Sequence, residues 1–148
     1  RDRSVSRGLG DVYKRQIVYG AKGSGKTKRI IDMANESIES AAGNIVFITD
    51  TNRYMFDVKY QIRALNVTEH KIFDEEALIG FIKGLIAGNH DISLIYIDGA
   101  HRIAKKDISE MQSFYDALEE ISQNQKVDFV VCVSSDLPEM PEFLKKYL

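Results

Sequence analysis

The stretch Gly20-Ala21-Lys22-Gly23-Ser24-Gly25-Lys26-Thr27 decides the fold of this chain. It matches the pattern G-x-x-x-x-G-K-[ST] at every fixed position, with an apolar stretch before it and an amphipathic stretch after it. Its glycines let the backbone curl so that successive N–H groups point at one anion, and the following helix adds the positive end of its dipole. We therefore predict that the whole stretch binds the phosphates of a nucleoside triphosphate.

Individual side chains of this stretch have distinct predicted roles. Lys26 is expected to reach the β- and γ-phosphates and is a candidate catalytic residue, and the Thr27 hydroxyl is expected to bind Mg²⁺. Lys22 and Lys28 are candidates for further phosphate contacts, although a solvated lysine is the more common outcome. The predicted cofactors are a nucleoside triphosphate and Mg²⁺.

The rest of the chain alternates short apolar runs with helical periodicity. Such alternation favours βαβ units, and nearly continuous apolar runs are typical of strands buried on both faces. We predict an α/β fold of three layers with a mainly parallel sheet of about five strands. The expected strands are 17–19, 45–48, 61–67, 92–97 and 127–133. The expected helices are 26–42, 74–87, one after a capping box at Asp107 and Glu110, and a short one that starts at Pro141. Residues 54–69 also fit a helix followed by a strand.

An acidic residue ends the apolar run Leu94-Ile95-Tyr96-Ile97-Asp98. The carboxyl ends of parallel strands open onto the ligand crevice of such sheets. We therefore expect Asp98 to bind Mg²⁺ together with Thr27 and to take part in catalysis. The alternative is that Asp98-Gly99 is an ordinary turn.

Polar residues follow the other predicted strands as well. Ser134 is a candidate contact for the γ-phosphate, although an ordinary loop serine explains it equally well. Arg53 and Arg102 are candidates for stabilising transferred phosphate charge, with a surface arginine as the default. Cys132 lies inside an apolar run and is expected to be inert core.

Composition sets broad limits on the partners. The net charge of −2 gives no global attraction to nucleic acid or to anionic lipid, so nucleic acid is not indicated. No apolar run is long enough for a membrane span, and the single cysteine fits a cytoplasmic protein. Glycines at 80, 84 and 88 recur on one predicted helix and suggest tight packing on the sheet or on a partner helix.

Residues 1–16 are basic and lack an apolar period. The segment from Ser6 to Gln16 resembles a translated transposase sequencing adapter. We therefore predict that 1–16 is a non-native tail and that 17–148 is the nucleotide-binding domain.

Together these motifs resemble a small P-loop NTPase domain of the RecA-like or additional-strand type. A finer resemblance is to short clostridial ATP-binding proteins, some labelled twitching-motility ATPases, which share the Gly20–Thr27 stretch, an Ile-Asp-Gly segment and a tail like Pro141 to Lys146. This resemblance implies ATP as the nucleotide. The sequence departs from many relatives at Gly99, where ATPases of the additional-strand type carry a glutamate that activates water. Asp50 and His101 are the candidate substitutes, although a turn aspartate and a surface histidine are the more common roles.

Three functions remain open at this stage. The chain is a slow or partner-stimulated ATPase, a nucleotide switch or scaffold with little turnover, or a kinase for a small acceptor. The absence of a glutamate at position 99 favours little turnover, and no segment reads as the lid that a kinase needs. An unknown protein partner or a homo-oligomer is compatible with the first two.

Overall fold

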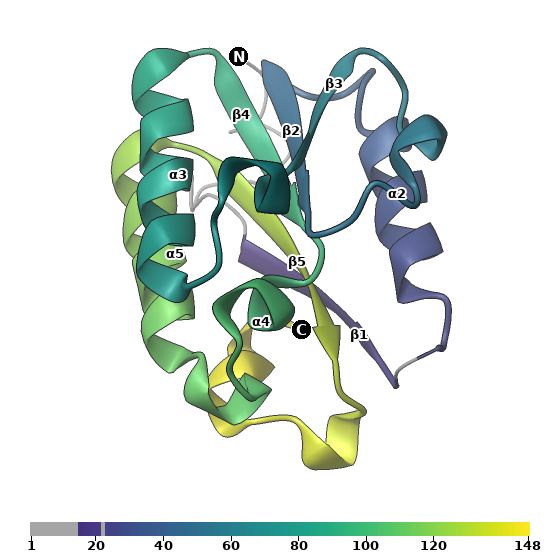
Figure 1. Cartoon of the computed structure of the whole chain (residues 1–148), viewed down its shortest axis with the longest axis vertical. Coiled ribbons are helices and arrows are strands. Elements are labelled where there is room, and N and C mark those ends of the chain that lie inside the picture. The colour runs from purple at the N-terminus through teal and green to yellow at the C-terminus, as the bar shows by residue number, and fades with distance from the viewer. Residues whose placement is uncertain (1–14, 22) are drawn as a thin grey trace.

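Five parallel strands form a single sheet in the order β1-β5-β4-β2-β3 (Figure 1). The computed structural model describes residues 15–21 and 23–148, so most of the predicted foreign tail lies outside the described residues. The strands are β1 Arg15–Gly20, β2 Asn44–Thr49, β3 Ile62–Asn66, β4 Ile92–Ile97 and β5 Asp128–Ser134. The predicted α/β fold with a parallel sheet is confirmed. The proposed start of the domain at Ile17 stays a prediction, and β1 itself includes the two residues before it.

Helices cover both faces of the sheet, which gives the expected three layers. The α-helices are α2 Lys26–Glu36, α3 Glu75–Gly88, α4 Ala100–Ala104 and α5 Gln112–Gln125. Figure 1 shows α2 on one side of the sheet and α3 with α5 on the other. Each face has its own buried cluster: Ile30 and Phe47 belong to the α2 side, and Ile82 and Phe114 belong to the α3–α5 side.

Short 3-10 segments fill the connections. They are η2 Met55–Asp57, η3 Val67–His70, η4 Ile108–Glu110, η5 Leu137–Glu139 and η6 Glu142–Tyr147. The capping box at Asp107 and Glu110 is present, but it caps η4 rather than α5. The alternative of a helix followed by a strand over 54–69 holds in shortened form, as η2 followed by β3.

The first helix ends six residues earlier than predicted, at Glu36 rather than at Ala42. The Ser37 hydroxyl donates to the Ala34 carbonyl at 2.7 Å, and the Ser37 N–H is shared between the carbonyls of Met33 and Ala34. A serine that bonds to the preceding turn competes with continuation of the helix. Apolar spacing alone therefore overestimated the helix.

Strand β5 lies between β1 and β4. The strand before the glycine-rich loop and the strand before Asp98 are therefore separated by one strand, β5. Both strands end at the same edge of the sheet because all pairings are parallel. Across the described residues, no helix is both long enough and apolar enough to cross a membrane.

Candidate functional site

The glycine-rich loop has the backbone that its sequence requires. Gly23 and Gly25 have φ values of 83° and 87°, a region that residues with a Cβ atom rarely adopt. A Cβ atom on Gly20 would lie 2.5 Å from the Ser24 hydroxyl oxygen, so the loop also folds back closely on itself. Gly25 is the N-cap of α2 and has no side-chain cap. The first N–H groups of α2 therefore face the loop, as an anion-binding helix start requires.

Two side chains of this loop are directed inward. Lys26 is 8% exposed, and its Nζ donates to the Ala21 carbonyl oxygen at 2.9 Å. The Thr27 Oγ1 lies 3.4 Å from Oδ2 of Asp98 and donates to it. The predicted metal ligands from the loop and from β4, 71 positions apart in the sequence, are thus side by side.

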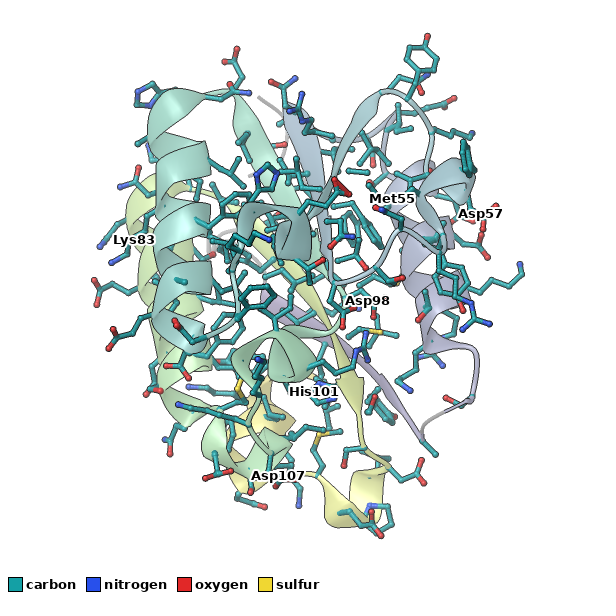
Figure 2. The ribbon with its side chains drawn as sticks, viewed as in Figure 1. Met55, Asp57, Lys83, Asp98, His101 and Asp107 are labelled. Atoms are coloured by element: carbon teal, nitrogen blue, oxygen red, sulfur yellow. The ribbon has the colours of Figure 1, made fainter. Side chains whose placement is uncertain are left out.

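Asp98 is a buried carboxylate at the carboxyl end of the sheet, next to the short helix α4 that carries His101 (Figure 2). Only 3% of Asp98 is exposed. Burial raises its pKa above the usual aspartate range, while the nearby Arg102 guanidinium and hydrogen bonds from Cys132 and Thr27 act in the opposite direction. The protein therefore retains a carboxylate where its ionised form is poorly solvated, a feature that concentrates at functional sites.

An arginine joins Asp98 to a second carboxylate. Arg102 donates to Asp50 through Nε at 2.8 Å and through Nη2 at 3.1 Å, and its Nη2 is 3.8 Å from Oδ1 of Asp98. Gly99 lies next to the Arg102–Asp50 pair and has a φ of 90°. A Cβ atom on Gly99 would lie 2.5 Å from Arg102 Nη2. Sequence reasoning named Asp50 and Arg102 separately but did not foresee their contact.

The remaining candidates lie at varying distances from this cluster. Ser134 ends β5 opposite Gly20 in the strand register, which places it at the start of the loop. His101 is half-buried, and burial together with the Arg102 charge lowers its pKa. Lys28 is exposed and pairs with Asp32 at 3.3 Å, which favours the solvated alternative. Arg53 lies over the Tyr54 ring, 5.5 Å from its centroid.

Lys22 lies outside the described residues. Its predicted phosphate contact therefore stays a prediction.

Cys132 is buried as expected, but its place in the register is informative. It pairs with Val18 of β1, and its thiol lies against Asp98. Burial and the Asp98 charge raise the pKa of the thiol to about 12, so it is held in the neutral form. Cys132 thus belongs to the buried core beside Asp98 and lacks reactive character.

The oxygen donors present suit magnesium better than a soft metal. Thr27 and Asp98 offer a hydroxyl and a carboxylate, which Mg²⁺ prefers. Within the described ranges, no group of three or more His, Cys, Asp or Glu side chains could hold a metal ion. A metal here would therefore need phosphate oxygens and water to complete its shell, as Mg²⁺ commonly does beside a nucleotide.

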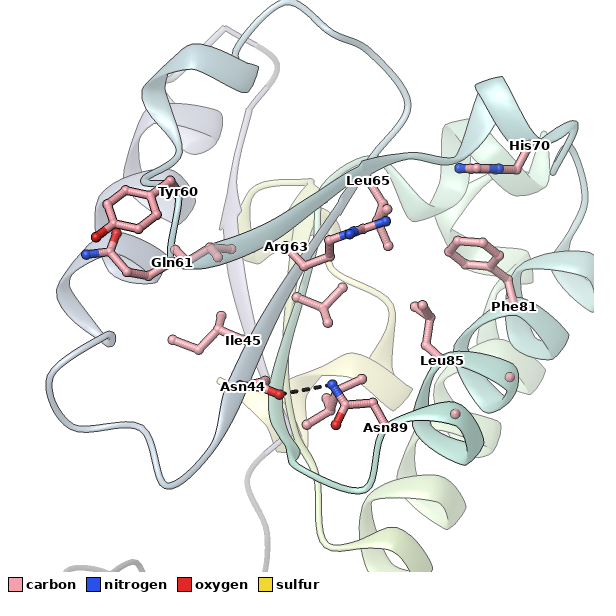
Figure 3. A pocket seen from close by; sticks show the side chains of 15 residues that line it. Asn44, Ile45, Tyr60, Gln61, Arg63, Leu65, His70, Phe81, Leu85 and Asn89 are labelled. Atoms are coloured by element: carbon pink, nitrogen blue, oxygen red, sulfur yellow. Dashed lines mark hydrogen bonds between the residues drawn. The ribbon is translucent and has the colours of Figure 1, made fainter.

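A groove of about 610 Å³ lies between α3 and the β2–β3 edge of the sheet (Figure 3). Phe81 and Leu85 of α3 face Leu65 of β3 across it, and none of the predicted nucleotide-binding residues lines it. Of the two predicted roles of Gly80, Gly84 and Gly88, tight packing on the sheet is wrong, because a Cβ built on any of them has no atom within 4 Å beyond its chain neighbours and the backbone of its own helix. Packing on a partner helix stays a prediction. Two of these glycines, Gly84 and Gly88, line the groove instead.

Comparison with known proteins adds a family. Residues 14–136 match the family model described as Schlafen group 3, DNA/RNA helicase domain. The crystal structure of the flagellar accessory protein FlaH from Methanocaldococcus jannaschii is similar at 12% identity and a TM-score of 0.47, covering 99% of this chain and 71% of FlaH. No curated protein sequence matches the chain significantly.

Proposed function

We propose that this chain binds ATP with Mg²⁺ at Gly20–Thr27 and hydrolyses it slowly or only with a partner. The chain belongs to the Schlafen group 3 DNA/RNA helicase domain family. The observation that carries this proposal is the 3.4 Å contact between Thr27 Oγ1 and Asp98 Oδ2. It joins the glycine-rich loop to the one buried acid at the same sheet edge among the described residues. That combination suits a triphosphate and its hard cation.

Each residue of the loop would contribute a distinct interaction. The curled backbone and the start of α2 supply N–H donors to the phosphates. Lys26 would exchange its bond to the Ala21 carbonyl for bonds to phosphate oxygens, since both acceptors lie along the same loop. Thr27 and Asp98 would hold Mg²⁺, which when bound neutralises phosphate charge.

Slow hydrolysis follows from what surrounds Asp98. A glycine occupies position 99, so no side chain there can activate water. Asp50, the candidate substitute, has both oxygens bonded to Arg102, so the oxygens that would accept a proton from water are already occupied. His101 keeps a depressed pKa and is the remaining candidate base, because a neutral imidazole can accept a proton.

The family description favours one class of stimulating partner. It names a DNA/RNA helicase domain, so nucleic acid is the first partner to test, although the net charge of −2 alone does not indicate it. A nucleotide switch without turnover is the second candidate and is favoured by Gly99. A kinase, a homo-oligomer, a cytoplasmic location and the finer resemblance to clostridial ATP-binding proteins all stay predictions.

The test is calorimetry of ATP and GTP binding, each with and without Mg²⁺, followed by ATP turnover. We expect ATP to bind more tightly with Mg²⁺ and turnover to be low in the chain alone. Turnover is then measured with single-stranded DNA, single-stranded RNA and duplex DNA added separately. Stimulation by one of them supports a partner-dependent ATPase, and tight binding without turnover under all conditions supports the switch. No binding of either nucleotide would refute the proposed function.

A further inference from the structure

Arg102 contacts Asp98 through the carboxylate oxygen that Thr27 does not contact. The two oxygens of Asp98 are divided: Oδ2 faces the Thr27 hydroxyl at 3.4 Å, and Oδ1 faces Arg102 Nη2 at 3.8 Å. Thr27 and Asp98 would hold the metal ion together. Arg102 contacts the other oxygen of the same carboxylate, so it leaves the oxygen beside Thr27 free of an arginine contact.

The arginine is held in that position by two features. Asp50 anchors the guanidinium with two hydrogen bonds, a planar geometry that lysine cannot reproduce. Gly99 provides the space, because a Cβ atom would lie 2.5 Å from Arg102 Nη2 and 2.9 Å from Asp50 Oδ1. The absence of a side chain at position 99 and the presence of the arginine bridge are thus geometrically linked.

The charges in this cluster balance only in part. Two acidic residues, Asp98 and Asp50, lie beside the proposed triphosphate site. Arg102 supplies one positive charge between them. The side chain of Asp98 is 4% exposed, so water screens its charge poorly, whereas the arginine is about half exposed. Without the arginine, a metal-free triphosphate would meet two uncompensated carboxylates.

We propose that Arg102 is the internal cation of this site, which neutralises Asp98 and Asp50 in the chain without nucleotide. Thr27 and Asp98 would hold Mg²⁺ when the nucleotide is bound. This inference rests on the proposed function. It makes Arg102 a positioning residue that sets how strongly ATP binding depends on the metal. Asp50 is then the anchor of Arg102 rather than a base.

The test measures a metal ratio, defined as the Kd for fluorescently labelled ATP in EDTA divided by the Kd in Mg²⁺. In Arg102→Gln we expect this ratio to rise about fivefold, the size typical of one partly exposed charge pair. The rise should come from weaker binding in EDTA, with binding in Mg²⁺ little changed. Arg102→Lys retains the charge and should keep most of the wild-type ratio.

Two controls separate this role from a structural one. Arg63→Gln makes the same change in net charge at an exposed arginine of β3 that lines the groove beside α3, and it should leave the ratio unchanged. In an Asp98→Asn background, Arg102→Gln should raise the ratio clearly less than in the wild-type background, because Asp50 is then the one carboxylate of the pair that loses its cation. Thermal unfolding of each variant checks that it is folded.

The outcomes are distinguishable. An equal ratio in wild type and Arg102→Gln, or an equal effect of Arg102→Gln with and without Asp98, overturns this inference alone. A wild-type chain that binds no ATP in either buffer overturns the proposed function and this inference with it.

Discussion

Strand β4 has a buried polar residue near each end, and the two serve opposite purposes. Ser93, near the amino end, is fully buried, and its hydroxyl accepts a hydrogen bond from the Gly43 N–H at 2.9 Å. Asp98, just beyond the carboxyl end, is 3% exposed and retains a carboxylate whose pKa burial raises. Ser93 is neutral and satisfies a backbone donor, whereas Asp98 carries charge at a cost in stability.

The surroundings of the two ends follow the same division. At the amino end, Asn89 donates to the Asn44 side chain at 2.9 Å, and the Asn44 N–H donates to the Asp91 carbonyl at 2.7 Å. These contacts close a turn with amide and backbone groups alone. At the carboxyl end, the contacts of Asp98 are to a hydroxyl, a thiol and a guanidinium. A polar strand end therefore indicates a ligand site only when its groups are charged and buried.

The largest expected effect is at the loop itself. Lys26→Ala should weaken ATP binding in Mg²⁺ by on the order of 100-fold, because the ammonium is the main charge directed at the phosphates. Calorimetry measures the change. Lys28→Ala, which removes an exposed lysine already paired with Asp32, serves as the matched control and should alter the Kd by less than about threefold. Equal losses in both variants would contradict the distinction.

Asp98→Asn should separate function from stability at the carboxyl end of β4. We expect the metal ratio for ATP to fall about tenfold or more, while the melting temperature at pH 7 rises by a few degrees, a change on the order of 1 kcal/mol. The gain arises because the variant no longer buries an ionised carboxylate. Asp116→Asn, at an exposed aspartate of α5, should show neither effect.

The stability difference between Asp98→Asn and wild type should depend on pH. The pKa of Asp98 is raised in the folded chain, so between the unfolded and folded pKa values the folded state binds more protons. The contribution of Asp98 to stability therefore falls as the pH rises through that window. The difference in melting temperature between Asp98→Asn and wild type should be largest near pH 7 and should vanish below the ordinary aspartate pKa of about 4. A constant difference would show that the carboxylate charge is not its cause.

Gly99→Glu introduces the glutamate that many additional-strand ATPases carry, yet we expect no gain in turnover. Gly99 has a φ of 90° and its Cβ position overlaps Arg102, so the substitution should destabilise the chain by about 1–2 kcal/mol and displace the arginine. Thermal unfolding and ATP turnover measure the two effects. A stable variant with faster turnover would show that a glutamate at position 99 can activate water without disrupting the contact between Arg102 and Asp50.

The smallest effect is expected at the amino end of β4. Ser93→Ala leaves the Gly43 N–H without its bonded hydroxyl and should cost about 1 kcal/mol of stability. ATP affinity and the metal ratio should not change, because the site lies at the other end of the strand. Thermal unfolding measures the loss of stability, and titration with labelled ATP measures the affinity and the metal ratio. Any shift in the metal ratio would contradict the proposed contrast between the amino and carboxyl ends of β4.

Local sequence predicted most elements of this fold but not the contacts between distant ones. Continuous apolar runs located most of the strands, because strands buried on both faces need them, whereas β3 was predicted from weaker alternation. Helix α4 escaped notice because its five residues are too few to show a period. The bond between Arg102 and Asp50 spans 52 positions, and no local pattern encodes such a pairing. The loop was predictable because its chemistry lies in consecutive residues.

The placement of β1 has a consequence for synthesis of the chain on the ribosome. In the described sheet β1 pairs only with β5, the last strand to be made. The loop and α2 leave the ribosome early, yet their strand has no neighbour until residues 128–134 have emerged. Nucleotide should therefore bind a nascent chain only after β5 has emerged, so that binding of the ligand reports that β1 and β5 have paired.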